Sequence, residues 1–180
     1  MVEIRAATEG DIPQIAAIYG PAVATGLASF ELEPPSAADM VSRFCAVVAG
    51  GFPYLVAVEG AQVLGYAYAS AYRTRPGYRF TVEDSIYVAP AAQGKRVGSH
   101  LLEALLAACE ARGFRLMVAV IGDSANAASI NLHRRAGFRF AGILHSIGWK
   151  HGRWLDSVMM EKALGTGDGA PPDDAQLPLP

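Results

Sequence analysis

A glycine-bearing turn between an apolar run and a strongly helical segment is well suited to binding a ligand. Residues 93–99 read Gln-Gly-Lys-Arg-Val-Gly-Ser. Glycines let a backbone approach a bound group closely, and the free N–H groups at a helix start attract anions. Lys95 and Arg96 add positive charge at the same place. The turn can therefore cradle a pyrophosphate, although two solvated cations in an ordinary strand-to-helix turn would leave the same pattern. It matches neither the GxxxxGK[ST] phosphate loop nor the GxGxxG dinucleotide motif.

A second basic pair, Arg73 and Arg75, lies just before Pro76-Gly77. At the end of a strand, alternation would direct both guanidinium groups to the same side. Arginine suits bidentate recognition of a carboxylate or phosphinate, but an exposed basic turn is an equally simple explanation. His145 and His151 have no metal-type spacing and no nearby cysteine, so no metal site is predicted.

Hydrophobic periodicity predicts the elements that position these residues. The clearest helix covers residues 97–112, with leucines on one face and Gly113 as its stop. Asp11 is the expected N-cap of a first helix, and Ser36 with Asp39 begins a second. A helix is also predicted over residues 126–136, and strands over 2–5, 54–58, 62–71, 80–88, 116–121, 138–144 and 154–160. The fold class is therefore α/β, with a mixed, mostly antiparallel sheet.

Composition limits the classes of protein that this chain can be. Of its 180 residues, 52% are hydrophobic and the net charge is −2, which excludes a disordered chain and argues against a nucleic-acid-binding protein. Two cysteines without metal or disulfide spacing, no signal peptide and no membrane-length apolar run predict a cytoplasmic protein without a membrane partner. We expect one domain over residues 1–164 and a flexible proline-bearing tail over residues 165–180.

The motif around the basic turn resembles a known family. Residues 87–90, Tyr-Val-Ala-Pro, followed by the turn at 93–98, resemble the acetyl-CoA-binding motif of the GNAT N-acetyltransferases, Gln/Arg-x-x-Gly-x-Gly/Ala. The resemblance continues at residues 118–122, 126, 132–138 and 148–156. This combination is similar to the phosphinothricin and methionine sulfoximine N-acetyltransferase branch and covers roughly residues 2–164. It implies a GNAT-like fold, a twisted sheet of about seven strands flanked by about four helices.

The resemblance implies acetyl-CoA as co-substrate, with no metal. Arg96 stands where the family motif usually has glycine. We expect this position to need only a backbone amide rather than a positive φ angle, so that arginine costs little and can reach a CoA phosphate. Asn126 resembles the family's CoA-binding asparagine, but it is nearly as well suited to capping a helix. The implied cofactor-binding residues are Val88, Ala89, Pro90, Gln93, Gly94, Lys95, Arg96, Val97, Gly98, Ser99, Asn126 and His133.

Acetyl transfer from a thioester to an amine needs a neutral amine, a polarised carbonyl and a route for the departing thiolate. The resemblance places the catalytic glutamate at Glu83, acting through water, and the polarising backbone amide at Val88. It makes His133 a candidate near the thiol. Without the motif, Glu83 reads as a carboxylate facing solvent, and His133 as a packed or capping helical residue.

The implied acceptor is the α-amine of a small amino acid such as phosphinothricin, methionine sulfoximine or methionine sulfone. Arg73 and Arg75 would bind its acidic groups. The implied substrate-binding residues are Phe30, Arg73, Arg75, Tyr78, Glu83, Ser85 and Tyr87. Trp149 and Trp154 are expected to pack or to lie at an interface, because this region lies near a dimer contact in the branch, and a homodimer is therefore expected.

Two other functions stay open. A GNAT enzyme could acetylate a protein amino terminus or a polyamine, although a polyamine site should be acidic and Arg73 and Arg75 oppose that. A regulatory module that binds CoA without turnover is favoured by Arg96 in place of glycine. A purely structural interaction protein would leave Glu83 and the basic turn unexplained.

Overall fold

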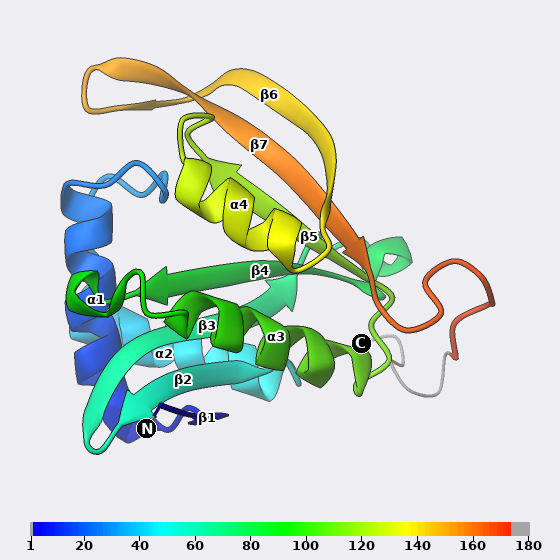
Figure 1. Cartoon of the computed structure of the whole chain (residues 1–180), viewed down its shortest axis with the longest axis horizontal. Coiled ribbons are helices and arrows are strands. Elements are labelled where there is room, and N and C mark those ends of the chain that lie inside the picture. Colours follow the sequence, from blue (N-terminus) through cyan, green and yellow to red (C-terminus); the bar gives the residue numbers. More distant parts are fainter. Residues whose placement is uncertain (1, 174–180) are drawn as a thin grey trace.

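The framework of the protein is one twisted sheet (Figure 1). A computed structural model describes residues 2–173. In this part of the chain seven strands follow the order β1-β2-β3-β4-β5-β7-β6, and every neighbouring pair is antiparallel except β4 and β5. The expected mixed, mostly antiparallel sheet is confirmed. The strands are β1 (Glu3–Ala6), β2 (Tyr54–Glu59), β3 (Gln62–Ala71), β4 (Thr81–Val88), β5 (Leu116–Gly122), β6 (Arg139–Lys150) and β7 (Arg153–Ala163).

Helices cover both faces of the sheet. The α-helices are α1 (Ile12–Ala24), α2 (Ala37–Ala49), α3 (Val97–Glu110) and α4 (Ala127–Arg135), and the 3-10 turns are η1 (Glu9–Asp11), η2 (Pro76–Tyr78) and η3 (Pro90–Ala92). Figure 1 shows α1 and α2 behind β2 and β3, and α3 in front of them. None of these helices is both long and apolar enough to span a bilayer.

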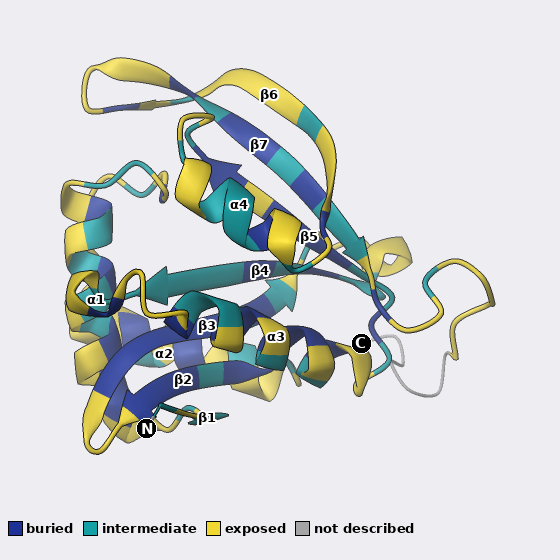
Figure 2. Cartoon of the chain, in the orientation of Figure 1, coloured by how far each residue is buried: buried dark blue, intermediate teal, exposed yellow. Residues whose placement is uncertain are grey.

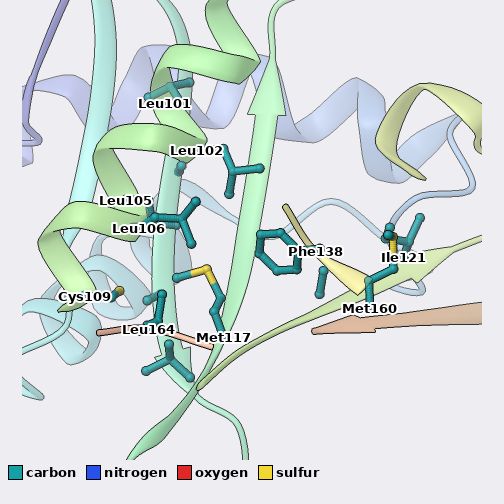
Figure 3. Close-up of a cluster of buried hydrophobic side chains, with 14 of the residues drawn as sticks. Leu101, Leu102, Leu105, Leu106, Cys109, Met117, Ile121, Phe138, Met160 and Leu164 are labelled. Carbon is teal, nitrogen blue, oxygen red and sulfur yellow. The ribbon is translucent and has the colours of Figure 1, made fainter. Parts of the chain in front are cut away.

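Two apolar cores fix the helices on the sheet. The leucine face of α3 (Leu101, Leu102 and Leu105) is fully buried against the sheet, beside Met117 of β5 and Phe138, which follows α4 (Figure 3). The second core joins α1 and α2 to β2 and β3 through a separate set of buried side chains. Burial of each such side chain contributes about 1.5–3 kcal/mol, and each face of the sheet has its own core. Figure 2 shows the buried positions on β2 and β3 between them.

The sheet divides where β4 meets β5. These strands pair only over Thr81–Glu83 and Leu116–Val118, and they diverge beyond Glu83 (Figure 1). The rest of β4 therefore has a partner, β3, on one side only. A backbone without a neighbour on one side leaves N–H and C=O groups available to a ligand.

The structure corrects two sequence-based expectations about local structure. Asp11 does not cap α1 with its side chain: a 3-10 turn precedes the helix, and the carboxylate instead accepts hydrogen bonds from the Thr8 N–H and from Arg5, each at 2.8 Å. The last two strands are longer than predicted; β6 is an edge strand with few buried residues and so lacks the alternation that marks a strand. Part of the predicted tail is described, and within it the Ala170 carbonyl accepts a hydrogen bond from Arg115. Residues 174–180 lie outside the described residues.

Candidate active site

A cavity of about 270 Å³ lies in the opening between β4 and β5. One wall is β4, where Glu83, Ser85 and Tyr87, the residues expected to share one face of the strand, line the cavity. Asp84 and Ile86 line it too, because the missing neighbour strand exposes that edge of β4. The remaining walls come from β5, from α4 and from the segment before α2 that contains Phe30. The lining residues are Tyr19, Ala28, Ser29, Phe30, Tyr68, Glu83, Asp84, Ser85, Ile86, Tyr87, Ala119, Val120, Ile121, Gly122, Asn126, Ser129, His133 and Ser157.

Glu83 is a partly buried carboxyl group on the wall of this cavity. Burial raises its pKa, the charge of Asp84 raises it further, and Arg73 offsets part of the rise. A carboxyl group with a raised pKa is a stronger base when ionised, and proton transfer is most efficient when the pKa lies near the working pH. The site can therefore accept a proton from a group bound beside Glu83.

Backbone register directs free amides into the same opening. The Ala89 N–H donates to the Leu64 carbonyl at 2.9 Å, and the β3–β4 pairing is regular from there to Val82. In an antiparallel ladder, alternate residues turn their N–H groups away from the partner strand. The Val88 N–H therefore points away from β3, toward the edge of β4 that is not paired with β5. A donor so placed can polarise a carbonyl oxygen.

Tyrosine side chains make the far wall rigid. Tyr87 contacts Tyr19 edge-on with ring centroids 4.8 Å apart, and burial raises the pKa of Tyr87 far above its usual value. The Tyr19 hydroxyl lies 3.0 Å from the Ser29 hydroxyl and donates to Glu31 at 2.8 Å, and Arg43 binds both oxygens of Glu31. The segment between α1 and α2 is thereby fixed against the cavity.

A second cavity, of about 710 Å³, adjoins the first at the amino terminus of α3. Most residues of the predicted cofactor turn line this cavity, but Ala89, Pro90 and Lys95 do not. Ile86, Asn126 and Ser129 line both cavities, so the two meet beside the start of α4. The lining residues are Ile86, Val88, Ala92, Gln93, Gly94, Arg96, Val97, Gly98, Ser99, Asn126, Ala128, Ser129, Asn131, Leu132 and Arg135.

Arg96 adopts a left-handed backbone conformation, with φ at +63°. The expectation that this position needs only a backbone amide is therefore wrong. Gly94 also has a positive φ, of +75°, so the chain turns sharply into α3 at both residues. A side chain with a Cβ costs roughly 1–2 kcal/mol in this conformation, which explains physically why glycine suits the position.

His133 is buried beside Asp84, a residue that the sequence analysis did not single out. Its Nε2 atom lies 3.0 Å from the Asp84 carboxylate, and its Nδ1 atom lies 2.8 Å from the Ser129 carbonyl. Burial lowers the pKa of His133, but Asp84 and the Ser129 carbonyl outweigh that effect and the net pKa is raised. Asn126 caps α4 by accepting from the Ser129 N–H, as the capping alternative predicted, and it lines both cavities.

Arg73, Arg75 and Tyr78 lie outside both cavities. Because β3 ends at Ala71, strand alternation does not extend to the two arginines. The Arg73 guanidinium lies over the Tyr72 ring, 5.1 Å from its centroid, and Tyr78 contacts the same ring edge-on. Among the described residues there is no group of three or more histidine, cysteine and acidic side chains that could hold a metal ion.

Two cavities that meet at the split in the sheet suit a reaction between a larger and a smaller ligand. Residues 25–138 match the family model described as "Acetyltransferase (GNAT) family". The chain is 48% identical over 170 residues to a phosphinothricin N-acetyltransferase of Alcaligenes faecalis, covering 94% of this chain and 86% of the relative. It is 43% identical to an L-methionine sulfoximine/L-methionine sulfone acetyltransferase of Pseudomonas aeruginosa, covering 93% and 98%.

A solved structure agrees with these relatives. The crystal structure of a GNAT phosphinothricin acetyltransferase from Sinorhizobium meliloti in complex with AcCoA superposes with a TM-score of 0.95 at 46% identity, covering 98% of this chain and 96% of that one. The chain therefore belongs to the GNAT family of acetyltransferases, and within it to the phosphinothricin and methionine sulfoximine acetyltransferase branch. The family and fold implied by the motif at residues 87–98 are confirmed.

Proposed function

We propose that this protein transfers an acetyl group from acetyl-CoA to the α-amine of a small amino acid of the phosphinothricin, methionine sulfoximine or methionine sulfone type. The observation that carries the proposal is the meeting of two cavities beside Asn126 and Ser129, with Glu83 on the wall of the smaller one. The names of the relatives supply the substrate class. A cavity of about 270 Å³ suits an amino acid.

The larger cavity is the proposed cofactor groove. Its wall at the start of α3 offers backbone N–H groups and the Arg96 side chain to the phosphates of CoA. The thioester would then reach the junction with the smaller cavity, where the Val88 N–H supports polarisation of its carbonyl oxygen. The remaining cofactor residues, Lys95 among them, stay predictions from the motif.

Glu83 is the proposed general base. The amine of the acceptor arrives as an ammonium and must lose a proton before it can attack the thioester carbon. A partly buried carboxylate in the same cavity supports this role, acting directly or through one water. Loss of the thiolate then completes the transfer on the side of α4, where His133 lies.

Arg73 and Arg75 are proposed to bind the acidic groups of the acceptor. Arg73 does not line the cavity, but its charge lowers the pKa of Glu83, which does. This effect supports a role for Arg73 near the acceptor. Phe30, Tyr87 and Ser85 line the cavity and are the proposed contacts of the acceptor side chain, with Tyr78 as a further candidate.

A homodimer is proposed from the outer edge of the sheet. Large apolar side chains are exposed on the β6–β7 hairpin: Phe140, Ile143, Leu144, Ile147, Trp149 and Trp154. An exposed apolar edge strand favours pairing with another chain, and a second copy presents the same surface. Sedimentation at micromolar concentration should give twice the chain mass, and a monomer would contradict the proposal. The expected cytoplasmic location is also kept as a proposal, supported by the two unpaired cysteines, Cys45 and Cys109.

The function is tested by measuring free thiol when the purified protein is mixed with acetyl-CoA and one acceptor. Phosphinothricin, methionine sulfoximine and methionine sulfone should each be tried beside a peptide with a free amino terminus and a polyamine. Release of thiol and formation of the N-acetyl amino acid with at least one of the first three supports the proposal. Turnover with the peptide or polyamine alone would assign the site to the rival acceptors, and binding of acetyl-CoA without turnover would assign it to the regulatory class.

A further inference from the structure

The hydrogen bonds of His133 fix how many protons it shares with Asp84. Nδ1 lies 2.8 Å from the Ser129 carbonyl oxygen, which can only accept, so Nδ1 carries a hydrogen. Nε2 lies 3.0 Å from Asp84 Oδ2, and two lone pairs at that distance would repel each other. A second hydrogen therefore lies between them. The pair holds one proton more than a neutral imidazole and a carboxylate.

Neither ring nitrogen of His133 faces a ligand directly, because both are turned toward the protein. The hydroxyl of Ser129, however, lies 3.4 Å from Nδ1, at the long end of hydrogen bonding. Ser129 is also one of the residues that line both cavities. A hydroxyl is able both to donate and to accept a proton, so Ser129 connects the buried pair to the junction of the two cavities.

The pair has a feature that a purely structural contact would avoid. Both side chains are only 2% exposed, and the second carboxylate oxygen of Asp84, Oδ1, is buried with no hydrogen-bond partner among the described residues. Buried polar atoms without partners are rare in native proteins, and they often mark a site that handles protons or binds a ligand. The apolar face of the ring packs edge-on against Phe138, which fixes its orientation.

We propose that Ser129 protonates the departing thiolate of CoA and that His133 and Asp84 are the positioning residues that resupply its proton. The inference rests on the proposed acetyl transfer and adds a group to it. As the tetrahedral intermediate collapses, the C–S bond breaks and its electron pair goes to sulfur. Sulfur takes the Ser129 hydroxyl proton in the same step in which the Ser129 oxygen takes the proton on His133 Nδ1, so that no alkoxide forms and the renewed hydroxyl donates back to Nδ1.

The protons balance over one turnover. The acceptor enters as an ammonium and loses two protons, of which one is matched by the proton gained by CoA sulfur and one is released to solvent. The His133–Asp84 pair regains its proton from solvent once the products have left. The other titratable groups around the pair are Glu83 on the same strand and Cys109 on α3, and burial raises the pKa of the Cys109 thiol to about 12, so it stays protonated.

Two substitutions separate a relay from a structural contact. Ser129→Ala removes the hydroxyl but keeps the carbonyl that binds His133. Asp84→Asn keeps the shape and a hydrogen bond, because the amide N–H can donate to a neutral Nε2, but it removes the shared proton. Ser129→Thr keeps a hydroxyl. Ser124→Ala is the matched control, since Ser124 is exposed just before α4 and lines neither cavity.

The test compares kcat, both Michaelis constants and the titration of His133 by nuclear magnetic resonance with labelled histidine. We expect kcat to fall about tenfold to a hundredfold in Ser129→Ala, with both Michaelis constants within twofold, and to recover in Ser129→Thr. In Asp84→Asn, kcat should fall similarly and His133 should titrate at lower pH than in the wild type.

An active wild type with an unchanged kcat in Ser129→Ala would overturn the relay alone. Equal titration of His133 in the wild type and in a folded Asp84→Asn variant would overturn the shared proton, and the relay with it. A wild type that releases no thiol with any amino-acid acceptor would overturn the proposed function, and the relay would fall with it.

Discussion

The amine of Lys150 lies 2.8 Å from the carbonyl oxygen of Ser29, and the lysine side chain is 2% exposed. Lys150 ends β6, whereas Ser29 belongs to the segment between α1 and α2 that lines the smaller cavity. Phe30 packs beside this bond against Gly148, where a Cβ atom would come 2.6 Å from the ring. The β6–β7 hairpin therefore sets the position of one wall of the proposed acceptor site.

This contact predicts that Gly148→Ala will weaken acceptor binding. The added methyl group must displace Phe30, and a shift of about 1 Å in a positioning residue can reduce activity as much as a hundredfold. Steady-state kinetics should show an acceptor Michaelis constant raised about tenfold and an unchanged constant for acetyl-CoA. Gly142→Ala on the same strand is the control, since its Cβ would meet nothing within 4 Å. Equal constants in the two variants would contradict the assignment of Phe30 to the acceptor wall.

The backbone of Arg96 predicts a stabilising substitution. Arg96→Gly relieves a left-handed conformation and should raise stability by about 1 kcal/mol, or roughly 2–4 °C in Tm. Thermal unfolding without ligand measures this. Lys95→Gly is the matched control: Lys95 has no positive φ, so glycine there should lower Tm. A Tm that falls in both variants would contradict the argument. If the guanidinium also binds a CoA phosphate, Arg96→Gly will weaken acetyl-CoA binding while it stabilises the fold.

The two arginines before η2 are tested one at a time. Arg73→Gln and Arg75→Gln should each raise the acceptor Michaelis constant about tenfold to a hundredfold, the range expected for loss of one charge-assisted hydrogen bond, without changing that for acetyl-CoA. Arg112→Gln, at the far end of α3, controls for the loss of a positive charge. Values unchanged in both test variants would mean that the acidic groups of the acceptor bind elsewhere.

The pH dependence of kcat/KM should report the ionisation of Glu83. The base acts only when deprotonated, so the rate rises with pH, and burial together with Asp84 places that rise above the usual glutamate range. Arg73→Gln removes a positive charge, raises the pKa of Glu83 and should move the rise to higher pH. Arg112→Gln, beyond the far end of α3, removes an equal charge far away as the control. A rise at the same pH in all three proteins would assign it to the acceptor amine, whose own titration is common to them.

The fold was predictable where the signal is local. The leucine spacing of α3 and the Ser36–Asp39 capping box each depend on neighbouring residues, and both are confirmed. The His133–Asp84 pair was not predictable, because its members lie 49 positions apart and meet only when α4 docks beside the opening in the sheet. Pairs of this kind are set by tertiary packing, which sequence periodicity does not record.

The same reasoning explains what the motif revealed about the site. Glu83, Ser85 and Tyr87 could be placed on one cavity wall, because the period of a strand is short and regular. Gly148 and Lys150 fall within the resemblance at residues 148–156, but their contacts with Phe30 and Ser29 could not be predicted, because those partners lie more than a hundred residues away. The left-handed conformation of Arg96 was not predicted either, because a motif shows which residue types recur but not the φ angle of a residue that departs from it.

The most direct test of the account is the rate of CoA release by Glu83→Gln beside the wild type, across pH, with saturating acetyl-CoA and methionine sulfoximine. Glutamine keeps the size of the side chain but cannot accept the proton of the amine. The account predicts a fall in kcat of about 10²–10⁴-fold near neutral pH and an unchanged affinity for acetyl-CoA. It also predicts loss of the rise in rate with pH that reports the ionisation of Glu83. Turnover and pH profile equal to the wild type would remove Glu83 from the chemistry and contradict the proposed mechanism.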